Sequence, residues 1–243
     1  MLELLALALA PVIFILTYVY LRDEYEREPL KYLLITFFLG ILTAFPVIWL
    51  SPYLRALTGV YSGSTGVVEL LVYAFVVVAL LEEGMKYLVL RWYNYPHDEF
   101  DEPYDGIMYG VAVSLGFAAI ENVFYVLNAG EGAFEMGLMR MFTAVPAHAT
   151  FGVMMGYFVG KAKFLHGAGH PFWERMKGLG TAVFFHGWYD YFLFLWQGYL
   201  ALFAFVALLV GLWLARRAMT LHAEISPHRD EEEPDGWRGL DQL

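Results

Sequence analysis

Long apolar segments are the feature of this 243-residue sequence that most limits what it can fold into. A helix needs about 17–25 apolar residues to cross the hydrocarbon core of a bilayer. Apolar residues make up 59% of the chain and charged residues only 16%, a balance that excludes an ordinary water-soluble domain. Seven segments are long enough: roughly 3–21, 32–50, 66–90, 106–128, 137–160, 177–196 and 198–215. The sequence therefore predicts an all-α fold, a polytopic transmembrane helix bundle with about seven spans.

We expect one membrane domain followed by a short tail. The membrane domain covers residues 1–217, and residues 218–243 form a polar, acidic cytoplasmic tail that we expect to be poorly ordered. The connection near Gln197 and Gly198 is so short that an even number of spans stays open. Ala8-Leu9-Ala10 resembles a signal-peptide cleavage site, but no basic residue precedes it and apolar residues follow it, which favours a retained helix.

The basic residues predict the orientation of the bundle. Twelve of the 15 Lys and Arg residues fall in one alternating set of connections, Arg55 and Arg140 fall in the other set, and Lys86 lies inside a span. Cytoplasmic loops of membrane proteins carry the excess of positive charge. We therefore expect the N-terminus outside and the C-terminus in the cytoplasm.

Composition also excludes several classes of function. The chain has no cysteine, so it has no disulfide framework, thiol nucleophile or cysteine metal site. Its formal charge of −10 argues against binding nucleic acid. The acidic connection between Arg91 and Asp105 is interpreted as a solvated cytoplasmic loop that needs no special function.

Polar side chains occur inside four consecutive predicted spans. An ionisable group costs at least ~2.5–3.5 kcal/mol at the centre of a bilayer, so these groups are expected to face one another. They are Glu82, Glu83, Lys86, Glu121, Asn122, His148, His186 and Asp190. Any one of them has an ordinary structural explanation as an interhelical hydrogen bond or ion pair, but their convergence favours a functional site inside the membrane.

The spacing of these residues suggests how they pair. Glu82 and Lys86 are four residues apart on one helix face, so we expect an ion pair there and leave Glu83 free to act. His186 and Asp190 have the same spacing, and the carboxylate is expected to hold the imidazole in one tautomer.

Three other residues are expected to act through packing. Gly152 follows His148 by four residues, which favours close approach of two helices. Phe117 precedes Glu121 by four residues and is expected to form an apolar wall beside it. Asn122 is interpreted as an amide that joins neighbouring helices.

Four short motifs follow one another in order along these spans. They are Glu82-Glu83-Gly84-Met85-Lys86 (EExxK), Phe117-Ala118-Ala119-Ile120-Glu121-Asn122 (FxxxEN), His148-Ala149-Thr150-Phe151-Gly152 (HxxxG) and His186-Gly187-Trp188-Tyr189-Asp190 (HxxxD), and Glu102-Pro103-Tyr104-Asp105-Gly106 opens the fourth span. With these motifs the sequence resembles the PrsW-type intramembrane proteases, a group similar to the CAAX prenyl proteases and the bacteriocin-immunity membrane proteins. The resemblance covers about residues 10–215.

This resemblance implies an endopeptidase that cleaves a membrane-anchored protein within the lipid bilayer, with site-one cleavage of an anti-sigma factor as one example. It implies an integral protein of a bacterial or archaeal cytoplasmic membrane. It also implies that the active site is lined by Glu82, Glu83, Glu121, His148, His186 and Asp190, with Lys86 and Asn122 in support.

Two mechanisms stay open. In a metal-free version, Glu82 or Glu83 is the general base, His148 shares the water, and His186 supports the oxyanion. In a metal version, His148, His186 and a carboxylate, Glu121 or alternatively Glu82, bind one divalent ion, with zinc the best match. We favour the metal version slightly, because it gives each residue one role, and we expect no other cofactor.

Other classes of function use buried polar groups too. A proton-coupled transporter is one alternative, although the sequence shows no internal repeat of the kind that many transporters have. A retinal photoreceptor is disfavoured because the last predicted span lacks a lysine. A catalytically silent adaptor of the same fold is a further alternative, and the retention of all four motifs argues against it.

Overall fold

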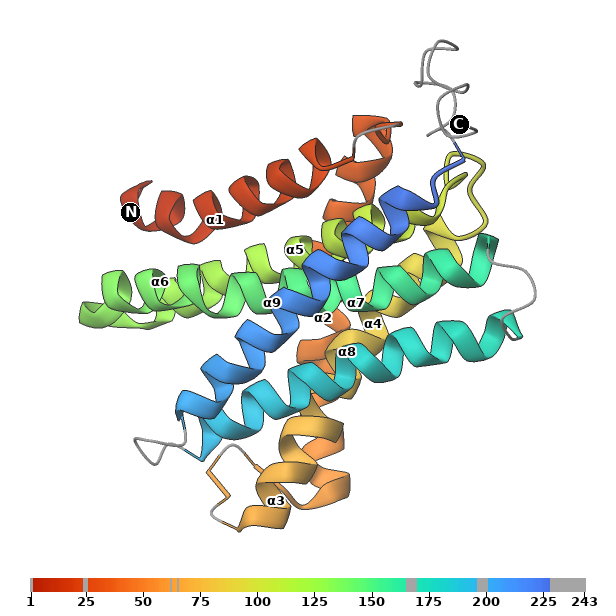
Figure 1. The fold of residues 1–243 in the computed structure, drawn as a ribbon. Coiled ribbons are helices and arrows are strands. Elements are labelled where there is room, and N and C mark those ends of the chain that lie inside the picture. The colour runs from red at the N-terminus through yellow and green to blue at the C-terminus, as the bar shows by residue number, and fades with distance from the viewer. Residues whose placement is uncertain are drawn as a thin grey trace, which may run out of the picture.

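The computed structural model describes residues 2–23, 26–61, 63–64, 66–164, 170–195 and 201–227. All the regular secondary structure in these residues is helical, which confirms the predicted all-α class (Figure 1). The elements are α1 (Leu2–Leu21), α2 (Leu30–Thr58), α3 (Val67–Val72), η1 (Tyr73–Ala79), α4 (Leu80–Val89), η2 (Leu90–Asn94), α5 (Pro103–Asn128), η3 (Gly130–Gly132), α6 (Ala133–Phe142), α7 (Ala144–Phe164), α8 (Pro171–Phe194) and α9 (Ala201–Glu224). η1 and η2 are π-helices and η3 is a 3₁₀ turn.

Each predicted span corresponds to a helix or to a run of helices. Five of these are long and apolar enough to cross a membrane: Leu2–Leu21, Leu30–Thr58, Pro103–Asn128, Gly130–Phe164 and Leu202–Glu224. The run from α3 to η2 and the helix α8 correspond to the other two predicted spans, and both carry several charged residues. The coarse expectation of a membrane helix bundle is met, while the total of seven spans and the orientation stay predictions.

Two boundaries differ from the expected ones. The predicted span 137–160 is two helices, because the backbone breaks at Thr143 between α6 and α7. α9 continues to Glu224, beyond the expected end of the membrane domain at residue 217. The connection near Gln197 and Gly198 and the tail from residue 228 onward lie outside the described residues.

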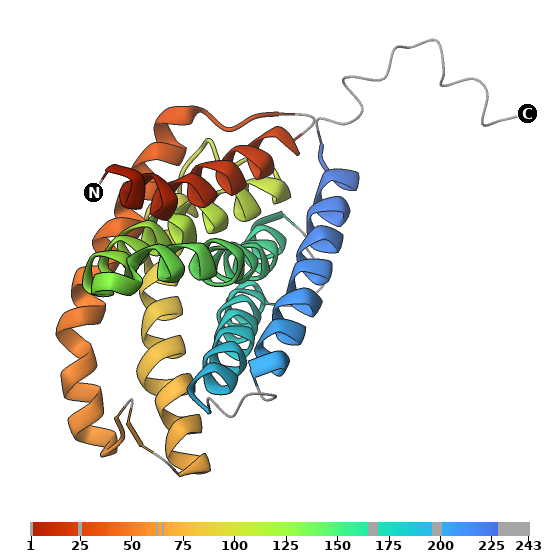
Figure 2. The ribbon, with the colours of Figure 1, turned by 90° about the vertical axis from the view of Figure 1, so that its left-hand side faces the viewer.

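Helix α5 is the centre of the bundle. Every residue from Pro103 to Ala119 is buried, and α5 packs against α1, α2 and α7. Figure 2 shows α2 and α9 at opposite edges of the molecule. A helix that is buried on all sides is expected to be apolar all round, and the few polar residues of α5 must therefore find partners within the protein.

Small residues allow α5 and α7 to approach backbone to backbone. A Cβ atom added to Gly152 would lie 2.5 Å from the carbonyl oxygen of Gly110, and one added to Gly106 would lie 2.5 Å from that of Gly156. This confirms the close approach expected at Gly152, and it is a common way for helices to associate where apolar burial gives no preference for protein over lipid. Because His148 lies one turn before Gly152, the contact also fixes His148 beside α5.

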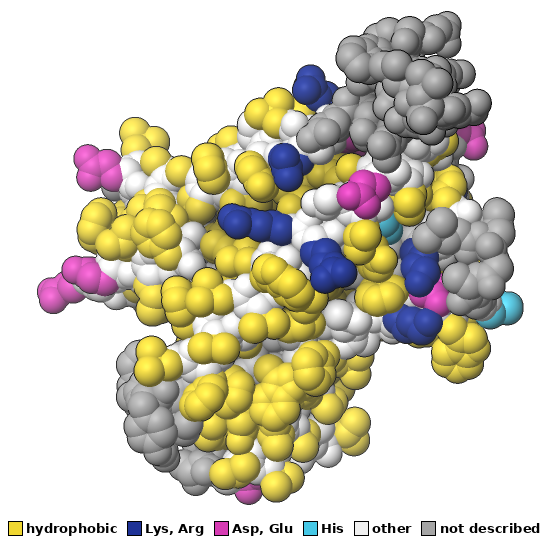
Figure 3. All heavy atoms as spheres, viewed as in Figure 1, with side chains coloured by type: hydrophobic (Ala, Val, Ile, Leu, Met, Phe, Trp, Pro, Cys, Tyr) yellow, Lys and Arg dark blue, Asp and Glu magenta, His cyan; other side chains and the backbone are white. Residues whose placement is uncertain are grey.

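The outer surface of the bundle is apolar. Large side chains stay exposed on its outer helices: Phe14 is 72% exposed, Leu57 is 82% exposed and Trp213 is 59% exposed. Figure 3 shows hydrophobic side chains over most of one face, with Lys and Arg gathered towards the end where the C-terminus lies. Exposed apolar surface of this extent is expected to contact lipid.

The orientation predicts the location of both chain ends. A reporter fused after Leu243 is expected to be active in the cytoplasm, and one fused before Met1 is expected to be active outside, because the basic connections follow the positive-inside rule. Paired phosphatase and fluorescent-protein fusions measure this directly. Both reporters on one side of the membrane would contradict an odd number of spans.

The contact between α5 and α7 predicts an unequal response to two identical substitutions. Gly156→Ala places a methyl group against the carbonyl of Gly106 and is expected to destabilise the protein by about 1–3 kcal/mol. Gly180→Ala, in the middle of α8 with no atom within 4 Å of the new methyl group, is expected to stabilise it by ~0.5–1 kcal/mol. Thermal unfolding in detergent compares them, and equal midpoints would contradict this role of Gly156.

Candidate active site

Helix α4 brings three of the predicted residues into the protein interior. Glu82, Glu83 and Lys86 lie in its first two turns and are 7%, 0% and 0% exposed. The π-helix η1 (Tyr73–Ala79) leads directly into α4. π-Helical turns are rare and occur often at functional sites, where they change the direction in which the following side chains point.

Lys86 pairs with both glutamates of α4. The expected ion pair with Glu82 is present at 3.9 Å, but Glu83, which was expected to be free, is the closer partner, and its Oε1 accepts from the ammonium at 2.6 Å. The same ammonium lies 3.2 Å from Nδ1 of His148 and 4.4 Å from the ring centre of Phe117. Phe117 thus forms the expected wall, and Glu82 is the carboxylate with the longer ion pair.

His186 is held between two carboxylates. Its Nε2 lies 3.3 Å from Oδ2 of Asp190, which confirms the expected contact, and its Nδ1 lies 2.8 Å from Oε1 of Glu83. The imidazole also stacks on the ring of Phe151, with 4.8 Å between the centres. These contacts fix the position and the plane of the ring.

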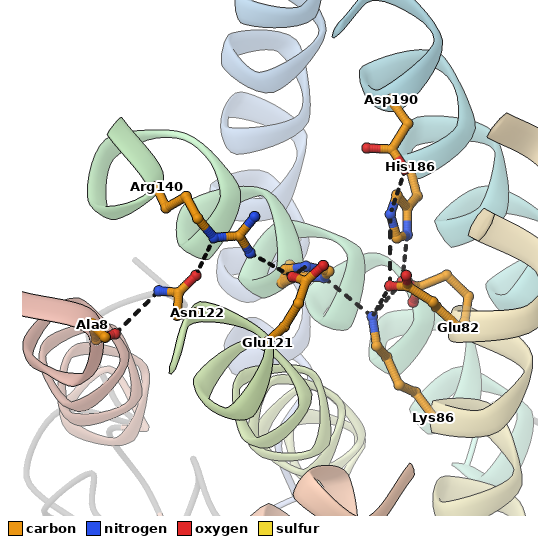
Figure 4. A network of polar contacts seen from close by, with 10 residues as sticks. Ala8, Glu82, Lys86, Glu121, Asn122, Arg140, His186 and Asp190 are labelled. Atoms are coloured by element: carbon orange, nitrogen blue, oxygen red, sulfur yellow. Dashed lines mark hydrogen bonds and ion pairs between the residues drawn. The ribbon is translucent and has the colours of Figure 1, made fainter. Parts of the chain in front are cut away.

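Glu121 and His148 meet on the other side of the site. Nε2 of His148 lies 3.0 Å from Oε2 of Glu121, and the guanidinium of Arg140 donates to the same oxygen at 2.5 Å. Arg140 also donates to Oδ1 of Asn122 at 2.6 Å, and the amide of Asn122 donates to the carbonyl of Ala8 at 3.1 Å (Figure 4). Asn122 therefore joins α1, α5 and α6, as its interpretation as an interhelical amide predicts.

Sequence reasoning missed Arg140. It was counted among the connections, yet the structure buries it beside Glu121. Its position inside the apolar segment 137–160 was the available signal, because an arginine within a span needs a partner.

These side chains surround one cavity of about 690 Å³. Its polar lining consists of Glu82, Glu121, Arg140, His148, His186 and Asp190, together with Arg55 and several hydroxyl groups. Glu83, Lys86 and Asn122 are not in the lining. Apolar side chains make up the rest of the lining, including Val47 and Ile48 of α2, Val77 of η1, Phe124 of α5 and Leu193 of α8. The cavity thus combines polar and apolar walls.

Part of the cavity lining has the donors of a metal site. Glu82, His148 and His186 each offer one ligand atom, all within 4.8 Å of one another, and all three residues are buried. Oε2 of Glu82 has no hydrogen-bond partner in the described part of the chain. Two imidazoles and one carboxylate match the ligands of a catalytic zinc ion, so the residues present fit a metal.

The carboxylate in this group is Glu82, the alternative ligand, and not Glu121. Glu121 is already bound to Arg140 and His148. The ammonium of Lys86 lies within 4 Å of both Glu82 and His148, so it would compete with a metal ion for these two ligands.

Comparison with protein families decides what kind of protein carries this site. A family model described as "PrsW family intramembrane metalloprotease" matches residues 28–215. The chain belongs to this family. It is therefore a member of the intramembrane metalloproteases, and the resemblance carried by its four motifs is confirmed.

Curated relatives agree with the family model. Protease PrsW of Geobacillus kaustophilus is 39% identical over 219 residues, which are 88% of this chain and 89% of that protein. Protease PrsW of Bacillus subtilis is 37% identical over 193 residues, covering 79% and 84% of the two chains. Protease PrsW of Clostridioides difficile is 33% identical over 193 residues, covering 79% of each chain. No solved structure matches the chain.

The contact between Arg140 and Glu121 predicts a loss of stability when it is broken. Arg140→Gln leaves a largely buried carboxylate without its cation and is expected to cost about 3–5 kcal/mol. Arg140→Lys restores the charge without the second bond to Asn122, so it is expected to cost less. Thermal unfolding in detergent measures both, with Arg55→Gln as a control, because its guanidinium bonds only the hydroxyl of Ser51 among the described residues. Equal unfolding midpoints for all three variants would show that the Arg140–Glu121 pair does not contribute to stability.

Proposed function

We propose that this protein is an endopeptidase that hydrolyses a peptide bond of a membrane-anchored protein in the cavity between α2, α4, α5, α7 and α8. The observation that supports this most strongly is the convergence of five predicted residues on one buried cavity: Glu82, Glu121, His148, His186 and Asp190. Membership of the family of intramembrane metalloproteases supports the same activity.

Glu82, His148 and His186 are the residues that would hold the metal ion. Such an ion supplies Lewis-acid activation of a water molecule and of the scissile carbonyl. In this version Glu121 lines the cavity as the carboxylate that accepts a proton from the attacking water. Arg140 orients Glu121 through its guanidinium.

The other residues act through their neighbours. Glu83 and Asp190 each lie beside one nitrogen of His186 and fix the orientation of its ring. If His186 held the metal ion through one nitrogen, the N–H of the other nitrogen would donate to the carboxylate beside it. Lys86 neutralises Glu83, which allows a second carboxylate to be buried next to Glu82. We therefore assign Glu83, Lys86 and Asp190 to positioning, and the cavity-lining Glu82, Glu121, His148 and His186 to catalysis.

A metal-free glutamate mechanism has one observation in its favour. Lys86 already balances the charge of Glu83 and touches His148, so the cluster is compensated by the protein's own groups. In this version Glu82 is the general base, because its Oε2 is buried, lacks a hydrogen-bond partner among the described residues, and belongs to a side chain that lines the cavity.

The proposed substrate is a membrane-anchored protein cut within or beside its anchor. Apolar side chains of α2 and α5 line the cavity and suit an apolar segment entering from the lipid. An anti-sigma factor cleaved at site one is the proposed biological substrate, and the cytoplasmic membrane of a bacterium is the proposed location. The relatives described above come from bacteria, which supports this location.

Two isosteric substitutions distinguish the proposed roles. Glu82→Gln is expected to abolish cleavage of a membrane-anchored reporter while the protein stays folded, since losing a general base costs ~100–10,000-fold and losing a metal ligand costs at least as much. Glu83→Gln is expected to lower stability first, because it leaves the ammonium of Lys86 buried without its nearest anion. Cleavage and thermal unfolding are measured together, with Glu69→Gln, at an exposed position on α3, as the matched control.

Metal analysis of the same preparations decides the mechanism. The metal version predicts bound zinc in the wild type, its loss in Glu82→Gln, and inhibition by a chelator that is reversed by added zinc. An active, metal-free wild type that resists the chelator would establish the glutamate mechanism. Full cleavage by both glutamine variants would contradict the proposed site altogether.

A further inference from the structure

A second group of buried acids lies far from the cavity. Asp23, Glu28, Glu102 and Asp105 are between 1% and 3% exposed, at the end of the bundle where the α1–α2 connection, the start of α5 and the end of α9 meet (Figure 1). Asp105 precedes Glu121 by 16 residues on α5, so about 24 Å of helix separates the two sites. The interpretation of the 91–105 connection as solvated was wrong for Glu102 and Asp105, which are buried, and no sequence pattern singled out Asp23 or Glu28.

The carboxylates point towards one another. Asp23, Glu102 and Asp105 each offer one oxygen, and these oxygens all lie within 4.8 Å of one another. Oδ2 of Asp105 accepts the backbone N–H groups of Asp101 at 2.8 Å and of Glu102 at 2.7 Å. The bond from Glu102 is half of a capping box at the start of α5, in which the Glu102 side chain also accepts the backbone N–H of Asp105, so the direction of both acids is fixed independently of any ligand.

Two more segments contact this group. The hydroxyl of Tyr109 donates to Oε2 of Glu28, which also interacts with Asp105. The hydroxyl of Ser226, just after α9, donates to Oε2 of Glu102. Three parts of the chain that are distant in sequence therefore converge on the same carboxylates.

Two oxygens of the cluster lack the partners that buried carboxylates require. Oδ2 of Asp23 and Oε1 of Glu28 are buried and have no hydrogen-bond partner in the described ranges. Among those same residues, no lysine or arginine forms an ion pair with Asp23, Glu28 or Asp105. Buried charges in proteins are paired or coordinate metals. The unpartnered oxygen of Asp23, on a side chain that is 98% buried and directed at Glu102 and Asp105, points to a missing positive ligand.

The electrostatics of the α1–α2 connection agree with this. Burial, followed by the charges of Glu102 and Glu28, raises the pKa of Asp23 to about 8, although Arg27 acts in the opposite direction. Burial likewise raises the pKa of Glu28 to about 7. The environment therefore disfavours bare carboxylates at neutral pH.

We propose that Asp23, Glu102 and Asp105, assisted by Glu28, form a second cation site that binds a hard divalent ion, Ca²⁺ or Mg²⁺. The donor set consists of carboxylate oxygens, which these ions prefer, and differs from the histidine-containing group in the cavity. The ion joins the α1–α2 connection to the start of α5. Because Asn122 binds the carbonyl of Ala8, α1 is then attached to α5 near both of its ends.

The test uses the full-length protein in detergent, stripped of divalent ions. CaCl₂ and MgCl₂ are titrated separately while thermal unfolding is followed, because an ion that binds only the folded state raises the midpoint as its concentration increases. The titration is carried out on Glu82→Gln, so that an ion in the candidate active site does not contribute. We expect a saturable rise of several degrees, and the ion that acts at the lower concentration is the one the site prefers.

Asp23→Asn and Asp98→Asn in the same background form a matched pair. Both remove one negative charge from the same end of the molecule, but Asp98 is exposed and lies outside the cluster. Asp98→Asn is expected to keep the full response to the ion. Asp23→Asn is expected to weaken binding by roughly tenfold or more, since affinity follows the number of charged ligands.

The stability of Asp23→Asn without added ions separates ligation from a structural role. A residue that only holds the connection in place would lose stability on substitution under all conditions. An ion ligand predicts the opposite: without ions, Asp23→Asn is at least as stable as its parent, because the amide has nearly the same shape and no ionised form that would be costly to bury. The proposal is overturned if neither ion shifts the midpoint, or if Asp23→Asn and Asp98→Asn respond equally.

Discussion

A charge buried in a membrane bundle must be balanced by groups of the same protein, and the candidate active site is arranged around one ammonium that does this. Lys86 lies between Glu83, Glu82 and His148, and its ammonium lies over the ring of Phe117. The carboxylate of Glu83 that binds Lys86 also binds Nδ1 of His186 on α8. Each of these helices therefore needs a neighbouring helix as the partner of its polar group. Such contacts specify one arrangement of the helices, which apolar packing alone does not, because lipid tails are as apolar as the side chains.

The glycine contact between α5 and α7 sets the distances within this network. With no Cβ atoms between the two backbones at Gly110 and Gly152, Glu121 on α5 can reach the imidazole of His148 on α7. Arg140 reaches the same carboxylate from α6 because the chain breaks at Thr143 and α6 is a separate helix. The small residues of α5 and α7 thus determine both how closely these helices pack and how far apart their polar side chains lie.

Sequence reasoning identified the motif residues because each spacing of three or four residues places side chains on one helix face. It paired Lys86 with Glu82 and left Glu83 free, although helical spacing permits both pairings, and the closer contact with Glu83 depends on His186 more than 100 residues away. Arg140, Asp23 and Glu28 were missed for the same reason: their partners lie on other helices. The acidic connection looked solvated because five charges in a short segment usually are, and only the tertiary structure shows that Glu102 and Asp105 are buried and that Ser226, just after α9, binds Glu102.

The π-helix before α4 has a consequence for how the family's sequences can vary. Its wider turns hold an extra residue compared with an α-helix of the same length. If α-helical winding returned in Tyr73–Ala79 with that extra residue kept, the following EExxK motif would turn by about 100° relative to the helix before it. Glu82 would then leave the cavity although every motif residue was still present. Substitutions in this segment that favour α-helical winding should therefore lower activity, even though the segment contains no motif residue.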